Sequence, residues 1–172
     1  NLAITYQAMA GSLDLAAELM RESRALLLGL GDRPRAALAQ LNLASIELDR
    51  ARRLAASEPA ASGAVVAEAR AGALESIAEC DAIGYVRAGI EGRLCLARAE
   101  TLAGNGETAA RVLAEVRERL AGYPSPFLET ALHLETGRHL RATGDARGAV
   151  RELETGLADC ERHDRQTFRA EL

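Results

Sequence analysis

Histidine and cysteine side chains are the groups in this sequence that could support catalysis or bind a metal. His133 and His139 are six residues apart, whereas two ligands on one helix face need a spacing of three or four residues. Cys160 and His163 could touch across one helical turn, but nothing in the sequence indicates an activated thiol. An enzyme that uses scattered histidines and glutamates is therefore the least favoured interpretation. We expect no catalytic residues, no metal and no cofactor.

The cysteines also bear on the cellular compartment. Cys80, Cys95 and Cys160 are odd in number and widely spaced, which argues against a disulfide framework. Small buried thiols in a reducing compartment account for them. We therefore expect a cytoplasmic location.

One glycine-rich segment has the form of a nucleotide-binding loop. Gly104-Asn105-Gly106-Glu107-Thr108-Ala109 matches the dinucleotide pattern G-x-G-x-x-G/A. That loop needs a preceding strand to aim its backbone N–H groups at a pyrophosphate. Residues 94–103 have helical character instead, so we interpret the segment as a turn between two helices.

The composition favours helices as the elements that would position any site. The 172 residues are about the size of one domain. Hydrophobic residues make up 48% of the chain and aromatic residues 3%, and the dominant Ala, Leu, Arg and Glu are strong helix formers. Residues with a preference for strands are too sparse to build a sheet. The sequence therefore predicts an all-α fold.

The charges and the apolar runs exclude two classes of partner. The chain carries 21 basic and 25 acidic residues, a formal net charge of −4, with the two signs interspersed. No basic stripe could neutralise nucleic-acid phosphates, and the longest apolar run, residues 26–30, is too short to cross a membrane. We expect a soluble protein with no nucleic acid and no membrane insertion. Because the first residue is Asn1 rather than Met, we also expect a fragment of a longer protein.

Turn residues divide the chain into helical segments of similar length. Gly, Asp, Asn and Pro cluster between the amphipathic segments, where helix caps and turns require them. One of these turns contains Pro59, which cannot continue a helix, and Ser62, which can cap the next one. The predicted helices cover residues 1–10, 12–29, 34–55, 63–80, 86–103, 107–121, 126–143, 145–161 and 165–172.

Each predicted helix carries apolar residues on one face only and must bury that face against neighbours. Antiparallel pairs of such helices at a period of roughly 40 residues predict an α-solenoid. Two of the apolar stripes are Ala109, Leu113, Val116 and Leu120 in residues 107–121, and Leu15, Leu19, Leu26 and Leu30 in residues 12–29.

Short motifs in this pattern resemble the tetratricopeptide repeat (TPR) superfamily. Asn1-Leu2-Ala3 and Asn42-Leu43-Ala44 resemble the start of the first helix of a TPR unit. Gly144-Asp145-Ala146-Arg147-Gly148-Ala149 resembles the turn that follows and the packing alanine of the second helix. Glu47, Glu100 and Leu140 stand where the family usually has a tyrosine.

The resemblance implies a right-handed superhelix formed by a single repeat domain. Its period is longer than that of the basic TPR unit and is similar to repeats found beside bacterial signalling domains, including diguanylate cyclases and transcriptional regulators. The implied units cover roughly residues 1–30, 34–80, 86–121 and 126–161, with a partial unit at 165–172.

The resemblance also implies where a partner binds. In such solenoids the first helix of each pair lines a concave groove, and in peptide-binding TPRs an asparagine of that helix often hydrogen-bonds the peptide backbone. We expect a groove that is apolar and amide-bearing at its N-terminal end and arginine-bearing at its other end. The residues predicted to contact a partner are Asn42, Ser45, Asp49, Cys95, Arg98, Glu135, Arg138 and Arg141.

Two roles are open for the arginines of this groove. Arg98, Arg138 and Arg141 could hold a carboxylate or an acidic segment of a partner through bidentate hydrogen bonds. Alternatively, they pair with carboxylates on neighbouring turns, namely Glu91, Glu100 and Glu135.

The leading functional prediction is a non-catalytic scaffold that binds a protein or peptide, as a regulatory or dimerisation segment of a bacterial signalling protein. The alternative is a sensory domain that holds a small ligand in the groove. Phe168 and Leu172 form an apolar edge on the last predicted helix, so self-association as a homodimer through these residues is a further expectation.

Overall fold

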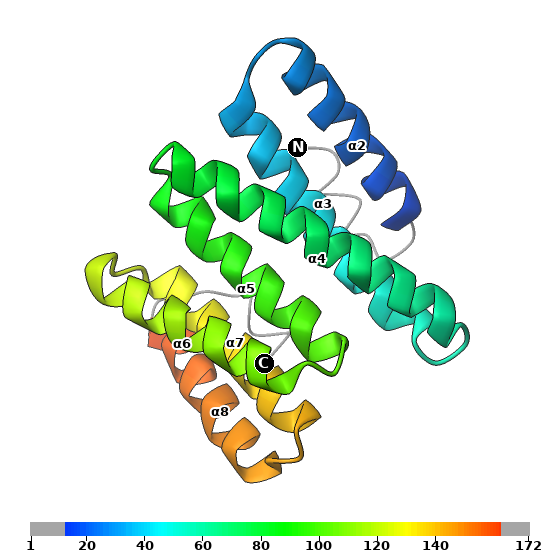
Figure 1. Cartoon of the computed structure of the whole chain (residues 1–172). Coiled ribbons are helices and arrows are strands. Elements are labelled where there is room, and N and C mark those ends of the chain that lie inside the picture. Colours follow the sequence, from blue (N-terminus) through cyan, green and yellow to red (C-terminus); the bar gives the residue numbers. More distant parts are fainter. Residues whose placement is uncertain (1–12, 163–172) are drawn as a thin grey trace.

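The computed structural model describes residues 13–162 and contains, in that part of the chain, seven α-helices and no β-strand (Figure 1). The all-α prediction is therefore confirmed, whereas the predicted helices at 1–10 and 165–172 lie outside the described residues. None of the described helices is long and apolar enough to cross a membrane. The helices are α2 (Leu13–Gly29), α3 (Arg33–Leu54), α4 (Pro59–Ala82), α5 (Val86–Leu102), α6 (Gly106–Gly122), α7 (Pro126–Ala142) and α8 (Ala146–Arg162).

Local sequence signals account for most helix ends. Asp32 caps α3 by accepting a hydrogen bond from the backbone N–H of Arg35 at 3.2 Å, and Ser125 caps α7 in the same way. Four glycines in the turns adopt positive φ angles, which strain residues with a side chain. They are Gly31, Gly84, Gly104 and Gly144.

The beginning of α4 differs from the prediction. This helix begins at Pro59 and not at residue 63, because a proline fits the first helical position, where its missing N–H costs no hydrogen bond. Ser62 therefore does not cap α4. Its hydroxyl donates a hydrogen bond to the carbonyl oxygen of Ala51 at 2.9 Å, which ties the start of α4 to the end of α3.

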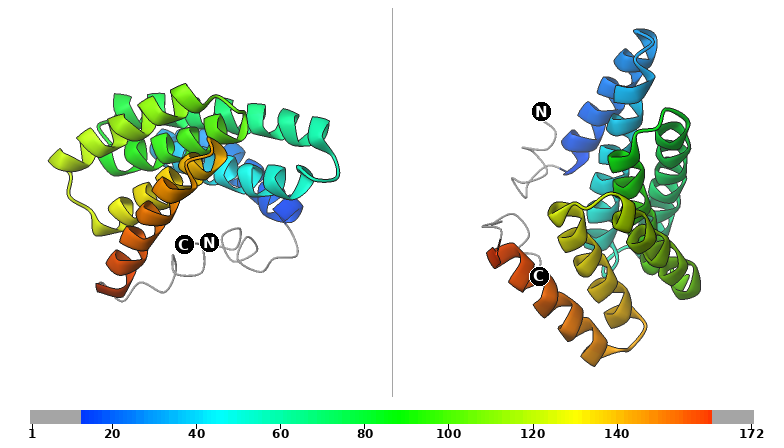
Figure 2. Two further views of the ribbon diagram at one scale, coloured as in Figure 1. Left: turned by 90° about the horizontal axis from the view of Figure 1, so that it is seen from below. Right: turned by 90° about the vertical axis from the view of Figure 1, so that its left-hand side faces the viewer.

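Helices that follow one another in the chain pack together, and alternate helices also meet. Besides the contacts between successive helices, α3 contacts α5 and α5 contacts α7. Figure 2 shows the described helices following an arch with α2 and α8 at its two ends. Helices α3, α5 and α7 form a continuous row within this arch, and the candidate site lies across that row.

The largest apolar cluster joins α3 to α7 and places small residues where helices approach closely. Leu48, Ile90 and Val116 are completely shielded from solvent in this cluster. Between α7 and α8 the close approach depends on Gly137, because a Cβ at that position would lie 2.6 Å from a methyl group of Leu153. The stripe predicted for α6 is confirmed, since Ala109, Leu113, Val116 and Leu120 are all buried.

The apolar face predicted for α2 is wrong for most of its residues, although Leu19 does pack against the buried cluster of α2 and α3. Leu26 and Leu30 are 70% and 81% exposed. Closely packed helices bury small residues in their contact, and the prediction placed the bulky leucines there instead. The residues of α2 that are buried are Leu13, Ala16, Ala17 and Met20.

Candidate functional site: a groove across three helices

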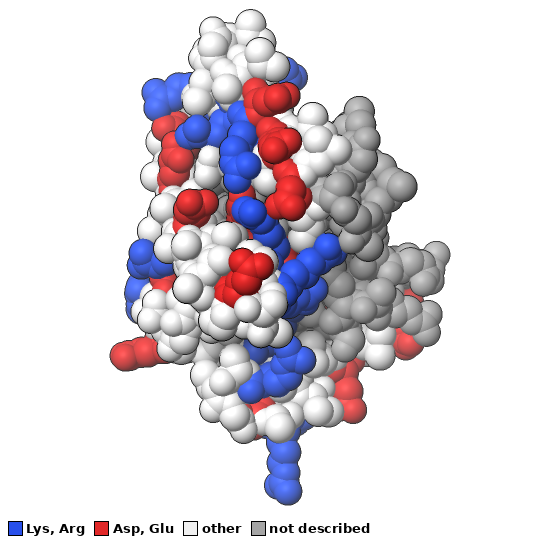
Figure 3. Space-filling model, turned by 90° about the vertical axis from the view of Figure 1, so that its right-hand side faces the viewer, with Lys and Arg blue, Asp and Glu red and all other residues white. Residues whose placement is uncertain are grey.

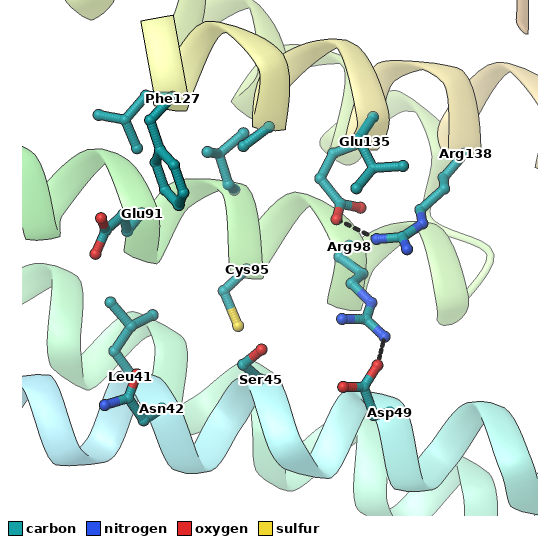
Figure 4. Close-up of a pocket in the computed structure, with 14 residues that line it drawn as sticks. Leu41, Asn42, Ser45, Asp49, Glu91, Cys95, Arg98, Phe127, Glu135 and Arg138 are labelled. Carbon is teal, nitrogen blue, oxygen red and sulfur yellow. Dashed lines mark hydrogen bonds and ion pairs between the residues drawn. The ribbon is translucent and has the colours of Figure 1, made fainter. Parts of the chain in front are cut away.

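A groove of about 320 Å³ crosses α3, α5 and α7. Within each helix its lining residues recur at intervals of three or four, so that they share one face. The lining residues are Leu41, Asn42, Ser45 and Asp49 on α3, Glu91, Leu94, Cys95 and Arg98 on α5, and Phe127, Leu128, Ala131, Leu134, Glu135 and Arg138 on α7 (Figure 4).

Most of the residues predicted to contact a partner come together in this groove. Equivalent positions of α3, α5 and α7 lie side by side because the three helices stand next to one another in the row. Arg141 is exposed but does not line the groove. The seven that line it are Asn42, Ser45, Asp49, Cys95, Arg98, Glu135 and Arg138. Their role in binding stays a prediction.

Sequence reasoning missed the residues at the other end of the groove. Glu91 precedes Cys95 by one helical turn, and Phe127 precedes Glu135 by two turns. The signal that could have found them is the same spacing of three or four residues, followed toward the start of each helix.

Four charged side chains form a row at one end of the groove. Asp49 on α3 pairs with Arg98 on α5, and Glu135 pairs with Arg138 at 2.6 Å on α7 (Figure 4). Burial opposes the charge of Arg98, but the nearby carboxylates of Glu135 and Asp49 outweigh burial and raise its pKa. Two positive and two negative charges cancel, so this row has no net charge.

This pairing bears on the two roles that were open for the arginines. Arg98 and Arg138 are bonded within the protein, as the second role requires. The partner of Arg98 is nevertheless Asp49 on another helix, rather than Glu91 or Glu100. A ligand carboxylate would therefore have to compete with an existing ion pair for Arg98.

Polarity in the groove changes along the helices as well as from one helix to the next. Leu41 and Phe127 lie at one end, and Asp49 and Arg138 lie at the other (Figure 4). The end at Leu41 and Phe127, here called the apolar end, also contains Asn42 and Glu91, whereas the other end is lined by two ion pairs. The expected change from an apolar and amide-bearing N-terminal end to an arginine-bearing end therefore holds in part. The amide of Asn42 is on α3 and the arginines are on α5 and α7, but all three helices also contribute apolar residues.

Cys95 lies in the middle of the groove, where its sulfur points toward Ser45 (Figure 4). Burial raises the pKa of this thiol to about 12, so that it is protonated at neutral pH. A protonated thiol is a poor nucleophile, and no histidine is found among the described residues that line the groove. The thiol in the described lining of the groove is therefore not an activated nucleophile.

The described histidines lie away from the groove. Nδ1 of His133 on α7 is 2.7 Å from Glu152 on α8, and its Nε2 is 3.8 Å from Asp159. His139 is buried, and His163 lies outside the described residues. In residues 13–162, no three His, Cys, Asp or Glu side chains are grouped so that they could hold a metal ion.

Charged side chains of both signs adjoin one another on the outer surface. On the face in Figure 3, Arg side chains lie directly beside Asp and Glu side chains. The ion pairs across helices include Arg24 with Glu75 and Arg33 with Glu79. On that face the basic side chains follow one another down the middle of the molecule, and acidic side chains lie along them.

A scan of the sequence against models of known protein families finds no match, and a search of curated protein sequences finds none either. The resemblance to the TPR superfamily therefore rests on the residue pattern of this chain itself.

Proposed function

We propose that this chain is a TPR-like α-solenoid whose groove across α3, α5 and α7 binds a peptide or helix of a protein partner without catalysing a reaction. The observation that carries the proposal is the groove. One face of three alternate helices is open to a ligand, apolar at one end and lined with mutually neutralising charges at the other.

The packing of the helices supports the TPR-like part of the proposal. In a solenoid of helix pairs, the first helix of each pair lies beside the first helix of the next pair. Contacts of α3 with α5 and of α5 with α7 fit that arrangement. Small residues at the crossings, such as Ala97 and Gly137, are buried as close packing requires.

The shape of the groove favours a partner over a small molecule. Its volume of about 320 Å³ is at the lower end of the range for small-molecule pockets, which bury most of their ligand. An open groove of this size takes a few side chains from a segment that continues beyond it. The small-ligand sensor remains the second candidate, supported by the polar groups of Asn42 and Ser45 that face the same space.

The biological role follows from the binding function. A groove that recruits a partner peptide suits a regulatory segment of a bacterial signalling protein, such as a diguanylate cyclase or a transcriptional regulator. A homodimer is a further part of this proposal, although Phe168 and Leu172 lie outside the described residues.

The proposal is tested by selecting binders from a random peptide library displayed on phage, with the 172-residue chain as bait. Ala131→Arg places a long cation in the middle of the groove. The matched control is Ala114→Arg, at an exposed position on α6 away from the groove. We expect the selected peptides to bind Ala131→Arg at least roughly tenfold more weakly than wild type, a loss of about 1.4 kcal/mol, and to bind the control unchanged.

Two results would count against this proposal. One is a library that gives no specific binder, and the other is a set of binders that Ala131→Arg leaves unaffected. A small molecule that stays bound in native mass spectrometry of wild type, and is absent from Ala131→Arg, would support the sensor instead.

A further inference from the structure

The aromatic residues of the described chain gather at the apolar end of the groove. Within residues 13–162 they are Tyr85, Tyr123 and Phe127, and they are 39%, 37% and 40% exposed. Large aromatic rings stabilise a core when they are buried. None of these three rings is buried in the core. They are instead partly exposed on the surface.

Two turns bring these residues together. Tyr85 directly precedes α5, whereas Tyr123 directly follows α6 and Phe127 lies in the first turn of α7. The α4–α5 and α6–α7 turns lie at the same side of the molecule, on the left in Figure 1. Phe127 also lines the groove, so the aromatic cluster and the apolar end of the groove form one surface.

Arg87 lies at the centre of this cluster. Its guanidinium is 5.6 Å from the ring centroid of Phe127, and its Nε donates a hydrogen bond to Glu91 at 2.9 Å. Glu91 raises the pKa of Arg87, and Tyr123 and Tyr85 are close enough to contribute. The side chain is therefore charged and held in place at two points, although it is 53% exposed.

Among the described residues, most of the hydrogen-bonding capacity of Arg87 has no partner. A guanidinium has five N–H donors, and only the one on Nε is bonded to a described residue. The four donors on Nη1 and Nη2 form the edge that binds a carboxylate through two parallel hydrogen bonds. Because stacking and the bond to Glu91 already restrict the side chain, binding costs less conformational entropy than at a free arginine.

We propose that Arg87, stacked on Phe127 and flanked by Tyr85 and Tyr123, anchors an acidic side chain of the partner while a neighbouring apolar side chain of that partner enters the groove beside Leu41 and Phe127. This inference rests on the proposed function, because it assigns a chemical selectivity to the same groove. Tyrosine and arginine are the residue types that most often dominate interface energies. The recognised segment thus combines a Glu or Asp with an adjacent large aliphatic or aromatic residue.

The test uses two sets of synthetic peptides with blocked termini, so that side chains carry their only carboxylates. One set places Glu beside Leu or Phe in varied flanking sequence, and the other has Gln in place of Glu. Binding to the 172-residue chain is measured by fluorescence anisotropy. We expect wild type to prefer the Glu set by roughly tenfold, as a charge-assisted hydrogen bond allows.

Substitutions of Arg87 test whether this side chain causes the preference for Glu. In Arg87→Gln we expect the two sets to bind equally, and in Arg87→Lys we expect a reduced preference, because an ammonium lacks the planar fork. Arg147→Gln, at an exposed arginine in the first turn of α8, should behave as wild type. Unchanged far-UV circular dichroism and melting temperature of Arg87→Gln would show that the variant is folded.

Failure of this inference can be told apart from failure of the proposed function. If wild type binds both sets equally, or if Arg87→Gln keeps the preference for Glu, the role of Arg87 is wrong, while binding that Ala131→Arg abolishes still supports the groove. If neither set binds but the random library yields groove binders, the selectivity is again wrong. If no peptide of any kind binds, both proposals fail. A concentration-dependent dimer that Tyr123→Ala dissociates would show that this edge meets a second copy and would overturn the acidic partner.

Discussion

Two arginines on α5 show how differently the two sides of one helix use the same side chain. Arg93 and Arg98 are both largely buried, with side-chain exposures of 8% and 12%. Arg93 hydrogen-bonds Asp81 on α4, Glu115 on α6 and the carbonyl oxygen of Gly89 on its own helix. Arg98 has a hydrogen bond to Asp49 on α3. The side of α5 that faces α4 and α6 is here called the packed side, and the side that lines the groove is called the groove side. Arg93 on the packed side joins α4, α5 and α6, whereas Arg98 on the groove side joins α3 and α5.

This difference indicates that Arg93 contributes to the stability of the fold, whereas Arg98 is placed where it could contact a ligand. Four of the five N–H donors of the Arg93 guanidinium are bonded, and the side chain is nearly buried, so little of it is left for a ligand. Arg98 lies in an open groove beside a second carboxylate, that of Glu135, so it can exchange partners at a lower cost. We infer that side chains of the packed side maintain the arrangement of the helices and that side chains of the groove side are available for recognition.

Replacing Arg93 by methionine should have the largest effect. Removal of one partner from a buried, hydrogen-bonded ion pair costs about 3 kcal/mol, and this variant leaves Asp81 and Glu115 with Arg119 alone, at 3.9 Å and 3.0 Å. The groove-side variant Arg98→Met breaks one ion pair, that with Asp49, instead of two, and should cost about 1 kcal/mol. The free energies of unfolding are measured by urea titration at pH 7, and equal losses in the two variants would contradict the comparison.

Steric tolerance should also differ between the two sides of α7. Gly137→Val places side-chain atoms into Leu153, because a Cβ there would already lie 2.6 Å away, and overpacking of this kind costs about 2 kcal/mol. Ala131→Val, on the groove side of the same helix, should cost less than about 1 kcal/mol. Thermal unfolding of both variants checks this prediction, which fails if Gly137→Val melts with wild type.

Low pH should lower the free energy of unfolding by less than either Arg93→Met or Gly137→Val does. The hydrogen bond from Arg93 lowers the pKa of Asp81 from its ordinary 3.8. Burial alone would raise the pKa of Glu115, but Arg93 and Arg119 outweigh burial and hold it below the ordinary 4.5. The unfolded chain therefore binds protons first as the pH falls. The stabilisation is present above about pH 4.5 and is lost at lower pH, as both carboxylates protonate in the folded protein.

Both carboxylates are about 40% exposed, so solvent screening keeps this loss to about 1 kcal/mol or less. Arg93→Met should show a flatter pH dependence than wild type between about pH 5 and pH 3. Urea titrations over that range provide the measurement. Parallel pH profiles for the two proteins would show that Arg93 does not set these pKa values.

Sequence reasoning succeeded where the signal is local. Turn glycines such as Gly84 and Gly144 marked helix ends, because a left-handed residue ends a helix regardless of what packs against it. The face that contains Ser45 and Arg98 followed from the resemblance to TPR units together with helical spacing. Pro59 was placed wrongly because the same residue can end one helix or begin another.

Sequence reasoning failed where more than one face of a helix is apolar enough to be buried. In α2 the leucines outweighed the alanines in the pattern, yet the alanines are the residues that allow close packing. The cluster around Arg87 was also missed. Tyr85 and Tyr123 are far apart in the sequence, and only the meeting of two turns brings them to one arginine.

By itself, the sequence determined that this chain is helical, where most of its helices end, and which residues share a face of each helix, because these properties depend on hydrogen bonds and steric limits within a few residues. Only the tertiary structure decided which face is buried, that Arg98 pairs with Asp49 of another helix, and that the groove changes from apolar to charged along the helices. Those outcomes depend on which surfaces meet in space, and that is set by close packing among segments that are distant in the chain.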